Sequence, residues 1–178
     1  MKIFTKKAAR AAALVGIMAA SIECAKLALA AIPNVEVVTL LIAVYSYVFG
    51  AFGVLASLIF VLIEPLIWGF GTWFISYLIY WPLVALVFSA LGARGVSGRV
   101  IPTVFAVILT ILFGVISSFV DVGIFSGSFD NLFYRFSVYY LRGIGFYLAE
   151  IITNAVLFPL LFLPITRLLS KIKKDSRL

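Results

Sequence analysis

Long apolar runs, separated by short polar or glycine- and proline-containing breaks, make up almost the whole chain and restrict its fold more than any other feature. A helix that crosses a bilayer needs about 20 apolar residues, so the 178 residues have room for six such helices and little more. Hydrophobic residues account for 65% of the chain and charged residues for 12%, whereas a typical globular domain is about 45–50% apolar and about 25% charged. The sequence therefore predicts an all-α integral membrane protein, a single bundle of six transmembrane helices.

The breaks between the runs divide this one domain, residues 1–178, into spans. Residues 121–140 are rich in Gly, Ser and aromatic residues, and we expect them to form the only long connector, either a surface loop or a short amphipathic piece. Pro159 and Pro164 interrupt the last span, and residues 170–178 are expected to form a polar, basic tail. The predicted spans are residues 9–31, 37–52, 55–68, 72–91, 100–120 and 141–169.

Most of the basic residues lie beside the ends of apolar runs. Eleven of the 14 Lys and Arg residues fall at the N-terminus, in the loop 92–99 and at the C-terminus. Lys and Arg beside membrane spans remain on the cytoplasmic side, so both termini and this loop are predicted to be cytoplasmic in a multi-pass protein of the cell (plasma) membrane. The formal charge of +7 is thus explained by contact with the lipid bilayer, and no nucleic-acid binding is expected.

The N-terminal run has a second interpretation as a signal peptide. Basic residues precede the apolar residues 11–22, and residues 28–30 read Ala-Leu-Ala, which is similar to a cleavage site. Because Glu23 and Lys26 interrupt the run, we expect a retained first span instead.

The chain contains no histidine, and this excludes most catalytic arrangements that operate in membranes. Ser-His and Cys-His pairs and His-ligated metals are impossible. The seven acidic residues are scattered along the sequence, and no glycine-rich phosphate loop with its lysine is present. We therefore predict no enzyme, no catalytic residue, no metal site and no cofactor, so uphill transport would need an ion gradient or a partner.

Small residues recur every four positions along the first span, at Ala8, Ala12, Gly16 and Ala20. At 3.6 residues per turn they form one slowly drifting stripe, and such stripes let another helix approach closely in lipid. The stripe predicts a docking surface for another subunit. Packing inside the same bundle, or a general richness in alanine, explains the same pattern.

Several polar side chains are predicted to lie at membrane depth, where they usually face a cavity or a partner. Glu23 and Lys26 are three residues apart and able to pair, and Glu150 and Asn154 share one face of the last span. These residues either line a ligand cavity or form satisfied structural pairs.

Aromatic residues gather around the third and fourth spans and in residues 121–140. A pocket for a ring-containing ligand would use such side chains together with a few polar groups, for which Asn34 and Glu64 are candidates. Trp and Tyr are also enriched at membrane interfaces, and Asn34 is equally consistent with a turn former.

Residues 8–16 read Ala-Ala-Arg-Ala-Ala-Ala-Leu-Val-Gly, and residues 29–41 read Leu-Ala-Ala-Ile-Pro-Asn-Val-Glu-Val-Val-Thr-Leu-Leu. With the small size, the basic ends and the six predicted spans, these segments resemble the substrate-binding S components of energy-coupling factor (ECF) vitamin transporters. The first is similar to the alanine motif that docks on the T component, and the second to the first-loop segment of several members.

The resemblance implies a bacterial protein that captures a vitamin or related micronutrient at its outer side. It implies association with a transmembrane T component and two cytosolic ATPase subunits, and inward release by toppling in the membrane. The substrate could be of the cobalamin, thiamine/pyrimidine or queuosine-precursor type, with a preference for a ring-rich vitamin. The stripe would serve docking, and the substrate-binding residues implied by their location are Asn34, Glu64, Trp68, Trp73, Tyr147, Glu150 and Asn154.

Two other classes of function stay open at this point. A stand-alone, ion-coupled transporter would use Glu23, Lys26 or Glu150 as its protonation site. A purely structural membrane scaffold would bind no small molecule.

Overall fold

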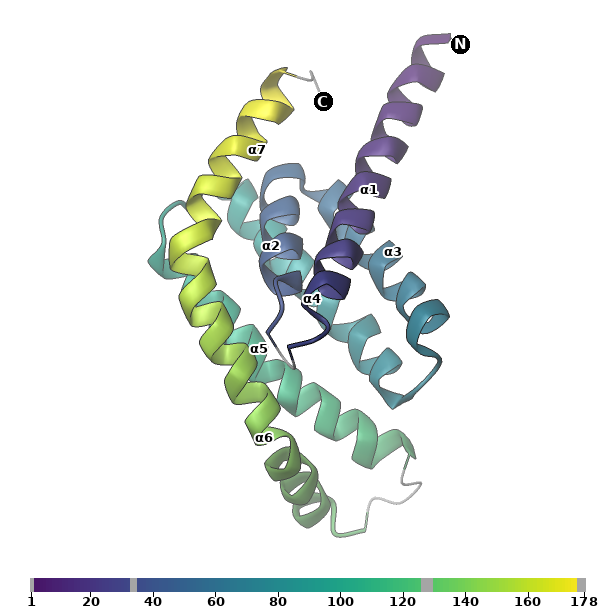
Figure 1. The fold of residues 1–178 in the computed structure, drawn as a ribbon, viewed down its shortest axis with the longest axis vertical. Helices are drawn as coiled ribbons and strands as arrows, with labels where there is room; N and C mark the ends of the chain where they lie inside the picture. Colours follow the sequence, from purple (N-terminus) through teal and green to yellow (C-terminus); the bar gives the residue numbers. More distant parts are fainter. Residues whose placement is uncertain (1, 33–34, 126–129, 176–178) are drawn as a thin grey trace.

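A computed structural model of the chain describes residues 2–32, 35–125 and 130–175, and these ranges contain helices and no strand. The last three helical elements follow one another without a break, so they form one long rod (Figure 1). In chain order the elements are α1 (Lys2–Leu29), α2 (Val38–Phe49), α3 (Ala51–Trp68), α4 (Thr72–Ala93), α5 (Val100–Val120), the π-helical turn η1 (Asp121–Phe125), α6 (Leu132–Leu157), the π-helical turn η2 (Phe158–Phe162) and α7 (Leu163–Asp175).

Five helices of the described chain are long and apolar enough to cross a membrane, as expected of a multi-pass membrane protein. They are α1, α3, α4, α5 with its η1 extension, and the α6–η2–α7 rod. The predicted second span is shorter than expected, because α2 has only 12 residues. Gly50, whose φ is +59°, alone joins α2 to α3 and so ends the helix early.

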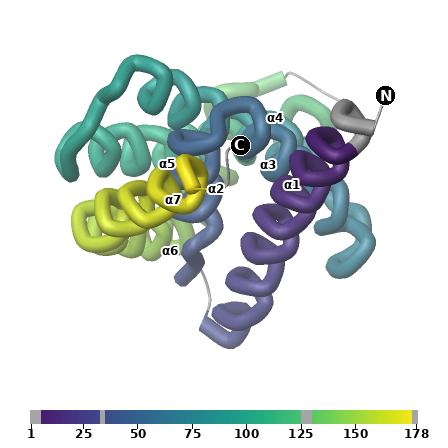
Figure 2. The backbone as a smooth tube through the Cα atoms, turned by 90° about the horizontal axis from the view of Figure 1, so that it is seen from above, coloured from purple at the N-terminus to yellow at the C-terminus, as the bar shows by residue number. Residues whose placement is uncertain are grey.

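The short helix α2 occupies the centre of the fold. It lies between α1 and the α6–α7 rod (Figure 2) and packs against α3 and α4 as well. Ile42, Ala43 and Val44 on α2 are fully buried, as are Val84 and Phe88 on α4. An apolar helix that is covered on all sides behaves as a core element, which is why α2 can be short without leaving its ends in lipid.

Helix α1 packs against the rest of the protein mainly through α3 and α2. Its buried residues, Val15, Met18, Ala19 and Ile22, follow the three- and four-residue spacing of one helix face. The N-terminal half of α1 extends beyond its neighbours, and its first turn lies at the same end of the molecule as the last turn of α7 (Figure 1).

Two predictions for the second half of the chain were wrong. Residues 121–140 do not form a long loop, because η1 continues α5 to Phe125 and α6 begins at Leu132, directly after Asn131 in the left-handed conformation (φ +53°). Residues 170–175 of the predicted basic tail continue the last helix and do not lie beyond its end, since α7 extends to Asp175. Lys173 fixes this last turn by donating a hydrogen bond to the Val48 carbonyl at 2.7 Å.

Prolines interrupt the helices less than the sequence indicated. Pro65 lies inside α3, which continues for three further residues to Trp68. Around Pro159 the rod changes to the π-helical turn η2 and then resumes as α7. A π-turn accommodates the backbone carbonyls that a proline leaves without an N–H partner, so the rod stays continuous.

Candidate functional site

A partly open cavity of about 300 Å³ lies where the last turn of α1 meets the segment before α2 and the helices α3 to α6. Such a volume is at the lower end of the range for small-molecule sites, which is about 300–1,000 Å³. Its walls combine aromatic rings, three ionisable side chains and the backbone of the first connection. The lining residues are Lys26, Leu29, Ala30, Ile32, Val35, Glu36, Trp68, Tyr77, Trp81, Phe113 and Glu150.

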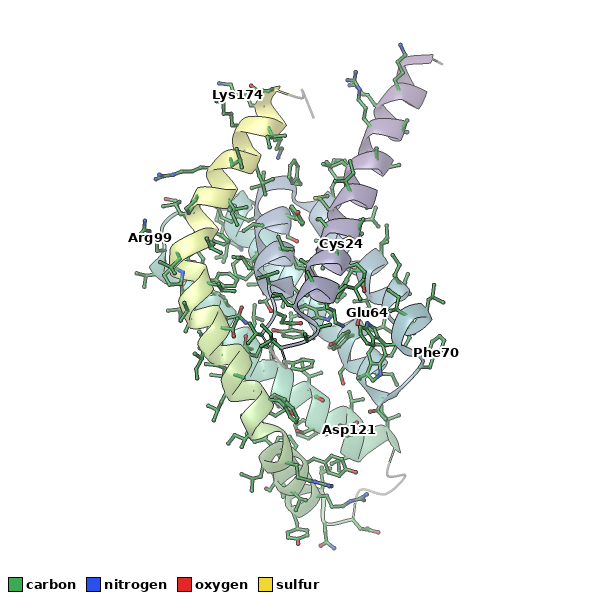
Figure 3. All side chains as sticks on the ribbon, viewed as in Figure 1. Cys24, Glu64, Phe70, Arg99, Asp121 and Lys174 are labelled. Carbon is green, nitrogen blue, oxygen red and sulfur yellow. The ribbon has the colours of Figure 1, made fainter. Side chains whose placement is uncertain are left out.

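Lys26 enters the cavity from α1 and forms a salt bridge with Glu64 of α3. Figure 3 shows Glu64 beside the lower end of α1. The Glu64 side chain is 1% exposed and that of Lys26 17% exposed. The ammonium group also lies over aromatic rings, 5.1 Å from the ring centre of Tyr77 and 5.9 Å from that of Trp68, distances at which cation–π attraction operates. Lys26 is the only basic side chain among the described residues that line the cavity, and Glu64 neutralises its charge.

Two further carboxyl groups line the cavity. Glu36 comes from the segment before α2 and Glu150 from α6, and the two side chains interact electrostatically. Two neighbouring carboxylates repel each other, so a proton held by one of them is favoured. Burial raises the pKa of Glu36 from its ordinary value near 4.5 to about 7, with Glu64 adding to the rise and Lys26 opposing it.

Glu23 completes an acidic group around the cavity but does not line it. Its side chain is 7% exposed, and neither carboxyl oxygen has a hydrogen-bond partner within the described part of the chain. The prediction that Glu23 pairs with Lys26 was wrong, because Lys26 reaches across to Glu64 on α3 instead. All four glutamates of the sequence therefore gather in or beside this one cavity.

The structure brings some of the predicted binding residues together and leaves others apart. Trp68 and Glu150 line the cavity, and Glu64 lies immediately behind it through its salt bridge. Trp73 does not line it and packs against Tyr77, with the ring centres 5.2 Å apart. Asn34 lies outside the described residues.

Tyr147 and Asn154 have packing roles between α5 and α6. The Tyr147 ring fills the space beside Gly114, where a Cβ atom would come within 2.8 Å of it. Asn154 is buried and donates a hydrogen bond to the Thr110 hydroxyl at 2.9 Å. Neither residue lines the cavity, although the Tyr147 ring does contact Phe113, which does.

Sequence reasoning missed Glu36 and Phe113, and it included Tyr77 and Trp81 only within the larger group of aromatic residues around the third and fourth spans. Tyr77 and Trp81 are four residues apart on α4, with their ring centres 5.5 Å apart, and this spacing was a usable signal for one shared helix face. Glu36 stood in the first-loop segment, but an isolated glutamate gives no indication of what faces it. Phe113 lies in a continuous apolar run and carried no signal.

The stripe on α1 is not buried against the protein's other helices. Ala8, Ala12, Gly16 and Ala20 are all exposed. No atom of the described chain lies within 4 Å of where a Cβ on Gly16 would stand. Packing inside this same chain therefore does not account for the stripe.

The raised pKa of Glu36 predicts a stability that declines as pH rises. The folded state holds a proton on Glu36 that the unfolded chain releases near pH 4.5, so this contribution is complete below about pH 4.5 and is lost as pH rises through about 7. Each pKa unit corresponds to about 1.4 kcal/mol. We expect Glu36→Gln to flatten the fall in melting temperature between about pH 5 and about pH 8, a range in which no histidine titrates because the chain has none.

Melting of the detergent-solubilised protein, followed by tryptophan fluorescence, provides the measurement. Asp175→Asn, an exposed change on α7, is the matched control and should keep the wild-type slope. An unchanged slope in Glu36→Gln would show that this carboxyl does not hold the proton.

Among the described residues, no three Cys, Asp or Glu side chains lie close enough together to hold a metal ion. The chain matches no model of a protein family, no curated protein and no solved structure.

Proposed function

We propose that this protein is the membrane-embedded, substrate-binding subunit of an ECF-type importer, which captures a vitamin or related micronutrient from outside a bacterial cell. A transmembrane T component and two cytosolic ATPase subunits would supply the energy, and the T component would bind the stripe on α1. In this proposal the short helix α2 belongs to the membrane bundle together with the five longer helices, which makes six in all. Both termini lie in the cytoplasm.

The observation that carries the proposal is the division of α1 into two surfaces. From Ala8 to Ala20 it presents an exposed small-residue stripe with open space at Gly16, whereas near its end it contributes Lys26 to a separate cavity. Small residues allow close helix–helix approach in lipid, and a cavity with aromatic walls and a few polar groups suits a small molecule. A subunit that binds a solute at one place and a partner at another needs this arrangement.

The positions of the chain ends support the proposed topology. The beginning of α1 and the end of α7 lie at one end of the molecule (Figure 1), and both are basic. Figure 3 places Lys174 at that end and Phe70 and Asp121 in the other half. Basic ends on the cytoplasmic side follow the positive-inside rule, and the cavity-forming connections then belong to the outer half.

The size of the cavity narrows the choice of vitamin. At about 300 Å³ it holds the volume that about ten water molecules occupy in the liquid. This space favours a ligand of the thiamine/pyrimidine class over one of the cobalamin class, whose macrocycle is far larger.

Native mass spectrometry of the gently purified protein tests the proposal directly. We expect one small molecule to remain bound and its mass to name the ligand. Uptake of that ligand into liposomes should require the ATPase partners and ATP. A protein that retains no small molecule and associates with no ATPase would instead be a structural scaffold.

A stand-alone, ion-coupled transporter is the second candidate. The buried carboxyl of Glu23, which has no hydrogen-bond partner among the residues that the structure describes, favours it. Intramembrane carboxyls often act as proton relays. This alternative predicts that the pure protein alone transports its solute into liposomes and that an uncoupler collapses the transport. ATP-dependent uptake that survives the uncoupler excludes it.

A further inference from the structure

Acidic side chains outnumber basic side chains around the cavity. Glu36 and Glu150 line it, Glu64 and Glu23 lie beside it, and Lys26 is the only basic residue among its lining side chains. The salt bridge to Glu64 occupies the ammonium group of Lys26. The Glu36–Glu150 pair is left without a basic residue of its own within the described chain.

Glu150 is an acid of the cavity wall that is paired with no basic residue of the described chain. It is 8% exposed and lines the cavity. Among the described residues the charged group that acts on it electrostatically is Glu36, another acid. A buried carboxylate is strongly unfavourable unless a proton or a positive charge compensates it. The free cavity meets this requirement with a proton, and a cationic ligand would meet it by replacing that proton.

Aromatic rings form the wall that such a ligand would contact. Tyr77 stands next to Trp81, with ring centres 5.5 Å apart, and next to Phe113, with ring centres 6.1 Å apart, and all three line the cavity. Ring faces attract organic cations and stack on planar rings. A metal ion would instead need several oxygen ligands, and no cluster of three such residues occurs in the described ranges.

We propose that the cavity binds a compact organic cation with a planar ring, whose positive group lies between Glu36 and Glu150 and whose ring packs against Tyr77, Trp81 and Phe113. This inference rests on the proposed solute-binding function and specifies the charge of the solute. An anionic ligand is disfavoured, because its charge would face two carboxyls while Lys26 is already paired with Glu64.

Binding of the cation should displace a proton from the Glu36–Glu150 pair. The titratable groups of the described chain that interact with Glu36 are Lys26, Glu64, Glu150, Tyr77 and Tyr80. Since burial raises the pKa of Glu36 to about 7, cation binding is expected to be about tenfold tighter near pH 8 than near pH 6, because one pH unit on either side of the pKa changes the ionised fraction about tenfold.

Three probes of one ring and different charge test the proposal on the full chain in lipid nanodiscs. These are 1-methylnicotinamide, which is cationic, nicotinamide, which is neutral, and nicotinate, which is anionic. Calorimetric titration, checked by quenching of tryptophan fluorescence, should give affinities in the order cation, neutral, anion. We expect a gap of about tenfold between cation and neutral, equivalent to 1.4 kcal/mol. The heat for the cation should also vary with the ionisation enthalpy of the buffer, which reports proton release.

Variants assign the preference to the two carboxyls. Glu150→Gln and Glu36→Gln should each bring the affinity ratio of cation to neutral close to one, whereas Asp175→Asn should keep the wild-type ratio. Unchanged nicotinamide binding would show that the cavity of a variant is intact. If a variant does not fold, the wild-type protein still tests the cation preference, through the order of affinities for the three probes and the pH dependence of cation binding.

Failure of this inference differs from failure of the proposed function. Equal affinities, a preference for nicotinate, or no binding of any probe overturns the cation inference. A copurified ligand that is neutral or anionic also overturns it, yet leaves the importer proposal in place. A protein that takes up no solute under any condition contradicts the importer proposal itself.

Discussion

Gly16→Trp is expected to abolish ATP-driven uptake while ligand affinity stays at its wild-type value. Gly16 lies on the exposed stripe, and none of the described residues of the other helices lies within 4 Å of where its Cβ would stand, so a larger side chain can leave the helix surface there. A partner helix that packs closely on the stripe would be held away by several ångströms, which removes the close contacts on which association in lipid depends. Uptake should fall to background, and the ATPase subunits should no longer copurify.

The matched control for this experiment is Ile17→Trp. Ile17 is the next residue along α1 and is 69% exposed, but its side chain leaves the helix about 100° away from that of Gly16. We expect this variant to transport normally. Normal copurification of the ATPases with Gly16→Trp would show that the stripe is not the docking surface. Loss of ligand binding in the same variant would point to misfolding.

A large loss of stability is expected when the salt bridge between Lys26 and Glu64 is broken. Either Lys26→Met or Glu64→Leu leaves an opposite charge buried without its partner, and such a change typically lowers the free energy of unfolding by about 3–5 kcal/mol. Removing both charges in the double variant Lys26→Met, Glu64→Leu should restore most of the stability, because an apolar pair of similar size needs no desolvated charge.

Denaturation of the four proteins in detergent completes a double-mutant cycle. A coupling energy near zero would show that the two charges act independently and that the salt bridge does not hold α1 on α3. Ligand titration of the double variant adds a further check, because the cation preference proposed for the cavity does not depend on this pair.

Local chemistry made most of the fold predictable. The apolar runs indicated the long helices, and the structure separates two of them, α2 and α3, at Gly50. The errors arose where tertiary contacts override local signals. The basic end of α7 stays helical because Lys173 reaches the Val48 carbonyl, 125 residues earlier in the sequence, and no local pattern records a contact of that kind.

The site was less predictable than the fold, for an identifiable reason. Polar residues at membrane depth singled out Glu150 and Lys26, because their cost in lipid demands an explanation. Their partners could not be inferred, since the Lys26–Glu64 and Glu36–Glu150 pairs each join segments far apart in the chain. Side-chain spacing on one helix predicts neighbours on that helix only, which is why Glu23 was expected to be the partner of Lys26.

The shortness of α2 has an electrical consequence. Twelve residues of helix measure about 18 Å, against about 30 Å of hydrocarbon, and the residues before it, 30–32 and 35–37, are not helical. Peptide groups at such a depth need protein or water as partners, and several of these residues border the cavity. In the proposed orientation, a cation held at Glu36 would therefore have crossed part of the membrane voltage, and an inside-negative potential should strengthen its capture.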